Sequence, residues 1–253
     1  MALLEIAGLT KRFGGLTALK DVSMTVDAGS IVALIGPNGA GKSTVFNVIT
    51  GIYAPSAGSV AFDGVSLVGR KPNAVAAAGV LRTFQNIRLF AFMTVLENVM
   101  VGRHARMHAT PFDGALRTPR AVREERAVRE RARELLEFVG LSQYEREWAR
   151  NLPYGMQRRL EIARALAAEP RLLLLDEPGA GANPAEKREL MDLVRSIRER
   201  GVTIVLIEHD MKLVMGISDH VTVLDYGEKI AEGDPERVRH DPRVIEAYLG
   251  KGA

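Results

Sequence analysis

Short apolar runs alternate with longer amphipathic stretches along the chain, a pattern that predicts strands and helices in turn. Residues 3–8 and 21–26 alternate apolar and polar side chains with the period of two that is typical of half-buried strands. Residues 31–35, 171–178 and 201–210 are instead apolar runs, as expected of strands that are buried on both faces. We therefore predict an α/β fold in which helices cover a largely parallel sheet and an antiparallel β sheet flanks it.

The amphipathic stretches predict helices, several of them in the middle of the chain. Residues 94–100 have helical spacing and a capping pattern from Thr94 to Glu97. A helix is also expected over 120–138, where arginine and glutamate pair at i, i+4 spacing and indicate a solvated face rather than a nucleic-acid surface. Residues 111–119 are expected to form a loop. Further helices are predicted over 156–168 and 184–200, and a closing hairpin over 221–233.

This order of elements suggests one domain with an insertion. The helical stretch at 87–157 separates two strand-containing parts, 1–86 and 158–253, which we interpret as two halves of one core. A chain of 253 residues with 47% hydrophobic residues is long enough to form such a unit.

Composition excludes several classes of protein. The absence of cysteine excludes disulfides and thiolate metal sites and is consistent with a reducing cytosol. A net charge of +3 is too small to indicate a nucleic-acid partner. No apolar run approaches the roughly 20 residues of a membrane-spanning helix, and the amino terminus lacks the order of a signal peptide. Any role at a membrane is therefore expected to depend on a partner protein.

The strand expected at 31–35 leads into a loop with the spacing G-x-x-x-x-G-K-S. Glycines lack a Cβ, so the backbone can take positive φ and bring its N–H groups against an anion. The helix that follows adds the positive end of its dipole, Lys42 can reach the β- and γ-phosphates, and the Ser43 hydroxyl can ligate Mg²⁺. An ordinary glycine turn is the alternative, but the strand before and the helix after favour nucleotide binding. The predicted nucleotide-binding residues of the loop are Gly36, Asn38, Gly39, Ala40, Gly41, Lys42, Ser43 and Thr44.

Two other predicted strands end in polar residues, and the carboxyl ends of parallel strands meet at one edge of a sheet. Asp176, after four leucines, is placed to hold Mg²⁺ opposite Ser43, and Glu177 to orient and deprotonate an attacking water. The alternative is that the two acids cap the next segment. His209, near the end of the strand expected at 201–210, is either a γ-phosphate sensor or an ordinary histidine.

Spacing alone does not decide two further candidates. Phe13 stands in a glycine turn expected at 11–15, and its ring is either a stacking surface for a purine or a plain core aromatic. Gln85 is either a ligand of the metal or of a water through its amide, or simply a loop residue.

Longer motifs resemble the ATPases of ABC transporters. Leu152-Pro-Tyr-Gly-Met-Gln-Arg-Arg-Leu-Glu-Ile-Ala-Arg-Ala165, followed by 172–178 and Glu208-His-Asp210, is similar to that family, and the resemblance covers essentially the whole chain. It implies a P-loop NTPase fold with a RecA-like parallel-sheet core, an antiparallel β subdomain and a helical subdomain at 87–157 that carries the signature segment. The roles it implies are catalysis by Glu177, His209 and Gln85, adenine stacking on Phe13, metal binding by Ser43, Gln85 and Asp176, and phosphate contacts from Tyr154 and Gly155.

The chain also resembles a narrower group, the ATPase subunit of branched-chain amino-acid importers. The residues that carry this resemblance are 82–90, 207–219 and the ending Ala247-Tyr-Leu-Gly250. It implies ATP and Mg²⁺ as cofactors and a second ATPase subunit, identical or paralogous. It also implies two transmembrane permease subunits, an indirect solute-binding partner and a place on the cytoplasmic face of the plasma membrane. The alternatives are another ABC client, such as urea import or lipopolysaccharide export, and a weakly hydrolysing nucleotide-gated module.

The signature segment departs from the family's usual L-S-G-G-Q. Pro153 replaces the serine whose hydroxyl usually contacts the γ-phosphate, and Met156 replaces the glutamine. Gly155 remains at the start of a helix, where a backbone N–H and the helix dipole can still meet phosphate. Asn183 stands where aspartate is commonest in the family, which keeps a hydrogen-bonding group and removes a charge.

Overall fold

A computed structural model describes residues 1–106 and 118–249, and the chain forms two compact units. The first unit combines Met1–Gln85 with Arg171–Ala253, and the second is Asn86–Pro170. The insertion was expected to end at residue 157, but helix α6 (Tyr154–Ala167) continues through that point without a break. Because α6 packs against the other helices of the second unit, the structure divides the chain after the helix rather than within it.

A six-stranded sheet forms the centre of the first unit. Its strand order is β10-β9-β3-β8-β7-β6, and all neighbouring strands are parallel except β10, which pairs antiparallel with β9. Every residue of β3, β7 and β8 is buried, which confirms the prediction from their apolar runs. The strands are β3 (Ile31–Ile35), β6 (Val80–Arg82), β7 (Leu172–Asp176), β8 (Thr203–Ile207), β9 (His220–Asp225) and β10 (Glu228–Gly233).

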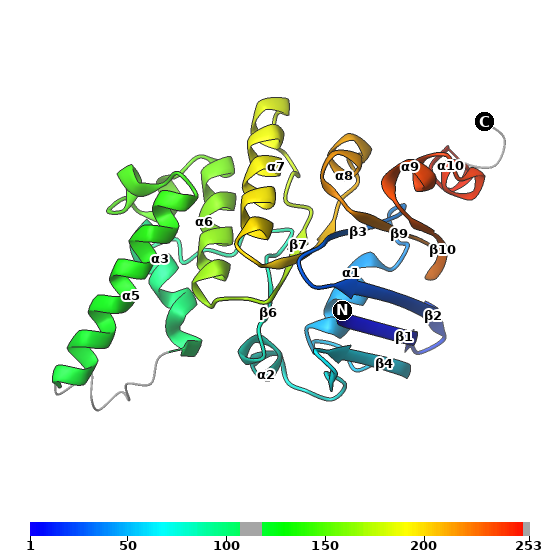
Figure 1. The fold of residues 1–253 in the computed structure, drawn as a ribbon, viewed down its shortest axis with the longest axis horizontal. Coiled ribbons are helices and arrows are strands. Elements are labelled where there is room, and N and C mark those ends of the chain that lie inside the picture. The colour runs from blue at the N-terminus through cyan, green and yellow to red at the C-terminus, as the bar shows by residue number, and fades with distance from the viewer. Residues whose placement is uncertain (107–117, 250–253) are drawn as a thin grey trace. The chain divides into compact units, whose positions relative to one another are not determined.

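Helices cover both faces of this sheet. In Figure 1, α7 (Pro184–Glu199) and α8 (Met211–Ile217) lie on one side of it, while α1 (Lys42–Ile49) lies on the other, next to the second sheet of the same unit. Phe46 of α1 is fully buried in the core between the two sheets. The unit also contains the short helices α2 (Pro72–Ala77), α9 (Pro235–Arg239) and α10 (Pro242–Leu249).

The second sheet has the strand order β2-β1-β4-β5 and is antiparallel throughout, as predicted. The glycine turn expected at 11–15 is narrower in the structure, because Lys11 and Phe13 still pair with β2 and only Gly14 and Gly15 form the turn. Its strands are β1 (Ala2–Phe13), β2 (Leu16–Asp27), β4 (Ala57–Phe62) and β5 (Val65–Ser66).

The described part of the second unit contains α3 (Val95–Gly102), α5 (Pro119–Phe138) and α6, together with the 3₁₀ helices Arg103–Arg106, Ser142–Tyr144 and Ala149–Asn151. The predicted capping box is present: Thr94 accepts from the Glu97 N–H, and the Glu97 carboxylate accepts from the Thr94 N–H. Two of the expected ion pairs on α5 form, Arg126 with Glu130 and Arg129 with Glu125.

Residues 111–117 of the expected loop lie outside the described part of the chain. No helix within 1–106 or 118–249 is long and apolar enough to cross a membrane.

Candidate nucleotide site

The loop between β3 and α1 has a backbone that requires glycine. Gly36 has a φ of 146°, and a Cβ built there would lie 2.0 Å from the backbone oxygen of Leu224. Gly41 has a φ of 102°, and its Cβ would lie 2.8 Å from the backbone oxygen of Ala18. Neither neighbour can move like a side chain, so a residue with a Cβ would displace the loop from β2 and β9. The glycines predicted from the motif therefore have a physical reason in the fold.

Helix α1 starts without help from a side chain. Gly41 is the N-cap, and no side chain accepts a hydrogen bond from the first turn of this fully described helix. The Lys42 side chain is buried, and its ammonium donates to the carbonyl oxygens of Gly36 at 2.7 Å and Pro37 at 2.8 Å. Burial lowers the pKa of Lys42, while the Glu177 and Asp176 carboxylates act in the opposite direction. The loop therefore places a cation beside backbone N–H groups that suit an anion.

Asp176 ends β7 as a buried carboxylate paired with an arginine. Its Oδ2 accepts from Arg82 Nη2 at 2.6 Å, and both side chains are almost fully buried. Arg82 also donates to Asn47 Oδ1 of α1 at 2.7 Å. Arg82 was not among the site residues predicted from the sequence. An arginine three positions before Gln85 was the available signal, but the pairing of β6 with β7 is needed to interpret it.

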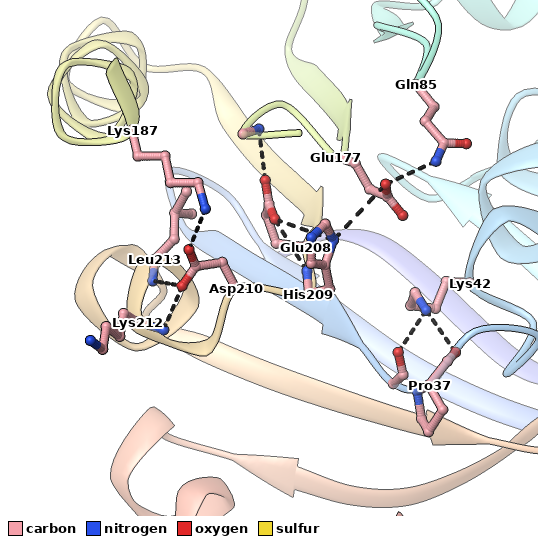
Figure 2. Close-up of polar contacts among 12 residues, drawn as sticks. Pro37, Lys42, Gln85, Glu177, Lys187, Glu208, His209, Asp210, Lys212 and Leu213 are labelled. Atoms are coloured by element: carbon pink, nitrogen blue, oxygen red, sulfur yellow. Dashed lines mark hydrogen bonds and ion pairs between the residues drawn. The ribbon is translucent and has the colours of Figure 1, made fainter. Parts of the chain in front are cut away.

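Glu177, Gln85 and His209 come together beyond the ends of β7 and β8 (Figure 2). Gln85 Nε2 donates to Glu177 Oε2 at 2.9 Å, and His209 Nδ1 lies 3.9 Å from the same oxygen. Glu177 has a φ of 46°, a conformation that non-glycine residues seldom adopt and that recurs at functional sites. The Glu177 side chain is 19% exposed and that of His209 is 58% exposed, so both can meet a ligand.

The predicted metal ligands suit Mg²⁺ by donor type. Ser43, Gln85 and Asp176 all supply oxygen, and Mg²⁺ usually takes only one or two protein ligands beside phosphate and water. In the described part of the chain, no group of three or more His, Cys, Asp and Glu side chains could hold a metal ion by itself.

Phe13 lies at the end of β1 and is 40% exposed. The ring meets Tyr53 edge-on, with centroids 5.1 Å apart, and the Lys11 ammonium lies 4.8 Å from its centroid. An aromatic ring with this much exposed surface is not a plain core residue, and it can offer a face to a base.

In the second unit, the signature segment forms the start of α6, two residues earlier than predicted. Pro153 is the N-cap, and Tyr154 and Gly155 are in the first turn, which no side chain caps. The Tyr154 hydroxyl accepts from Arg158 Nη2 at 3.3 Å, and the Arg158 guanidinium pairs with Glu161 at 2.8 Å in the interior. Tyr154 is thus held by a side chain of the next turn.

Comparisons with known proteins agree with this geometry. A family profile described as "ABC transporter" matches residues 19–180, and one described as "Branched-chain amino acid ATP-binding cassette transporter" matches residues 228–253. The chain is 48% identical to the high-affinity branched-chain amino acid transport ATP-binding proteins BraF of Pseudomonas aeruginosa and LivG of Escherichia coli. Each match spans 98% of this chain and 98% of the relative.

Solved structures give the same result. An ATP-binding cassette of an ABC transporter in its ADP conformation is 35% identical, with a TM-score of 0.87 over 99% of this chain and all of that one. A bacterial ABC transporter cassette solved as a dimer is 26% identical, with a TM-score of 0.77 over 92% of this chain and 98% of that one. The chain therefore belongs to the ABC transporter family, as an ATP-binding ATPase with the P-loop NTPase fold.

Proposed function

We propose that this chain hydrolyses ATP to drive an importer of branched-chain amino acids from the cytoplasmic face of the plasma membrane. The near full-length identity to BraF and LivG supports this client, as does the profile that matches residues 228–253. One structural observation carries the proposed hydrolysis: Glu177, at the end of β7, is held by Gln85 and approached by His209.

The phosphate loop binds the triphosphate in this proposal. The N–H groups at the start of α1 donate to phosphate oxygens, and the Lys42 ammonium exchanges the carbonyls of Gly36 and Pro37 for the β- and γ-phosphates. Asn38, Gly39, Ala40 and Thr44 complete the loop, and Phe13 stacks on the adenine. Triphosphate binding thus depends mainly on backbone groups and one cation.

Glu177 acts as the general base. Its carboxylate, oriented by the Gln85 amide, takes a proton from the water that attacks the γ-phosphorus. The bond from the γ-phosphorus to the bridging oxygen breaks as the new one forms, and ADP and inorganic phosphate are the products. His209 contacts the γ-phosphate and reports its presence to β8. Ser43, Asp176 and Gln85 would hold Mg²⁺, which supplies positive charge to the phosphate oxygens.

Three kinds of partner are part of this proposal. A second ATPase subunit, identical or paralogous, would place its own Tyr154–Gly155 segment against the ATP of this chain, and a related cassette has been solved as a dimer. Two permease subunits would contact the second unit, where Phe92 and Trp148 are 71% and 45% exposed and Arg150 lies over both rings. A solute-binding protein would act through the permeases.

Glu177→Gln tests the proposed hydrolysis. The amide keeps the size of the side chain and cannot accept the proton, so we expect steady-state hydrolysis to fall by about 10²–10⁴-fold while MgATP affinity changes by less than about twofold. Glu186→Gln, the same change in the first turn of α7, is the matched control and should keep the wild-type rate. An unaltered rate for Glu177→Gln would remove this residue from the mechanism. Co-purification with identified permeases would distinguish branched-chain amino-acid import from urea import or lipopolysaccharide export.

A further inference from the structure

Glu208 is a buried carboxylate to which the proposed hydrolysis assigns no step. It follows β8 directly and is only 1% exposed, whereas the next residue, His209, is largely exposed. Strands β7 and β8 are parallel neighbours with Asp176 opposite Ile207, so the segments that follow them run side by side. A carboxylate in such a place is costly to bury unless hydrogen bonds satisfy it.

Backbone N–H groups from both segments provide those hydrogen bonds. Glu208 Oε1 accepts from the Gly179 N–H at 2.7 Å, and Oε2 accepts from the His209 N–H at 3.1 Å. Gly179 is two residues after Glu177, so one carboxylate joins the chain just beyond Glu177 to the chain at His209. Hydrogen bonds to an ionised acceptor are about twice as strong as neutral ones, which makes this a firm link between two loops.

A second link involves Asp210, the residue that follows His209. Lys187 of α7 pairs with Asp210 Oδ2 at 2.6 Å, and Asp210 Oδ1 accepts from the N–H groups of Lys212 and Leu213 at the start of α8. Figure 2 shows both carboxylates with their hydrogen bonds: Glu208 and Asp210 precede and follow His209 in the sequence. Both sequence neighbours of His209 are therefore bonded to residues that follow β7. Glu208 is bonded to Gly179, and Asp210 is bonded to Lys187 of α7.

The packing around Gly179 matches this link. Gly179 does not have a positive φ, so its backbone conformation alone does not require glycine. A Cβ at this position would nevertheless lie 2.8 Å from Glu208 Oε1 and 3.2 Å from Leu213 Cδ1. The small residue lets the carboxylate reach the N–H.

We propose that Glu208 is a positioning residue that fixes the Glu177 and His209 segments in one register. Glu177 and His209 then face the same γ-phosphate, and a shift of one segment is passed to the other through the carboxylate. The inference rests on the proposed function, since it gives Glu208 a purpose only if Glu177 and His209 act together on ATP.

Glu208→Gln tests the link with little change in size. The amide provides only one acceptor oxygen and turns its NH₂ toward the second backbone donor, so one of the two hydrogen bonds is lost. We expect kcat to fall by about 10–100-fold, as a small misplacement of reacting groups can cause, with a MgATP dissociation constant within about twofold of the wild type. Hydrogen exchange at the Gly179 or His209 amide should accelerate by at least about tenfold.

Glu186→Gln is the control for the same substitution at a carboxylate that accepts a backbone N–H but does not contact His209. Its carboxylate also accepts a backbone N–H, from Asn183 at 2.8 Å, on the same β7–α7 connection. This variant should keep the wild-type kcat and the wild-type exchange rates at Gly179 and His209. A purely structural Glu208 would instead lower stability and leave kcat of the folded protein unchanged, which would overturn the proposal.

Gly179→Ala reaches the same link from the other side and decides the question if Glu208→Gln does not fold. Its Cβ should displace the carboxylate and lower kcat to a similar extent. Glu208→Ala and Gly179→Ala both remove the same link, so the double variant should be no slower than the slower of these two single variants. Additive losses, or a wild-type rate for Gly179→Ala, would overturn the proposal. Glu177→Gln in the same assay separates the two hypotheses: if it retains hydrolysis, the proposed function itself fails.

Discussion

The connections after β3 and after β7 both lead from a buried parallel strand into a helix, but they satisfy the start of that helix differently. In α7, Asn183 accepts from the N–H groups of Ala185 at 2.9 Å and Glu186 at 3.1 Å, and Glu186 accepts from Asn183 in return. In α1, the N-cap is Gly41 and no side chain of the described chain caps the first turn. The α7 start is complete within the chain, whereas the α1 start has backbone donors that suit an external anion.

The comparison assigns different tasks to the two connections. The β3–α1 connection has glycines and one buried lysine, which is what binding an oxyanion requires. The β7–α7 connection follows Asp176, the last residue of β7, and begins with Glu177. The first turn of α7 is capped by the side chains of Asn183 and Glu186. The connection can therefore orient carboxylates without offering a second anion site. The proposed phosphate site and the carboxylates that would act on it are thus on two strands of one sheet, β3 and β7, which lie on either side of β8.

Removal of Arg82 should have the largest effect on the β7 side. Arg82→Met leaves the buried Asp176 carboxylate without its ionic partner, and loss of one member of a buried pair costs about 3–5 kcal/mol in the free energy of unfolding. Urea denaturation of wild type and variant measures this. The double variant with Asp176→Leu should recover most of the loss, because no charge then remains buried. A loss below about 1 kcal/mol for Arg82→Met alone would show that water reaches Asp176.

A smaller effect is expected from the cap of α7. Asn183→Ala removes the acceptor for two N–H groups and should lower the free energy of unfolding by about 1 kcal/mol. Glu186→Gln should change it by only a few tenths, because glutamine also serves in a capping box. MgATP affinity should stay the same in both variants. If Asn183→Ala weakened MgATP binding more than about fivefold, the two connections would not be independent and the comparison would fail.

Much of the first unit could be predicted from the sequence, because its signals are local. The buried runs at β3, β7 and β8 and the glycine spacing of the phosphate loop each depend on a few neighbouring residues. The grouping of Glu177 with His209 also followed from one rule, namely that parallel strands end at the same edge.

What the sequence could not supply depends on the order of strands and on the continuity of helices. Arg82 meets Asp176 only because β6 lies beside β7, and Glu208 joins two loops only because β7 lies beside β8. The division after residue 157 cut through α6, since a signature motif marks function and not the end of a helix. The packing of the Phe13 ring likewise involves Tyr53, a residue 40 positions away that the turn pattern does not reveal.

The central claim is that the β3–α1 connection binds a triphosphate through backbone donors and Lys42. Calorimetric titration of MgATP into the wild type, Lys42→Ala and Lys71→Ala tests it directly. Lys71 precedes α2, another helix start without a side-chain cap, and serves as the matched control. Loss of a charge-assisted contact to phosphate should weaken binding by about 10–100-fold in Lys42→Ala and leave Lys71→Ala unchanged. Absence of MgATP binding by the wild type, or equal affinity for wild type and Lys42→Ala, would contradict the account.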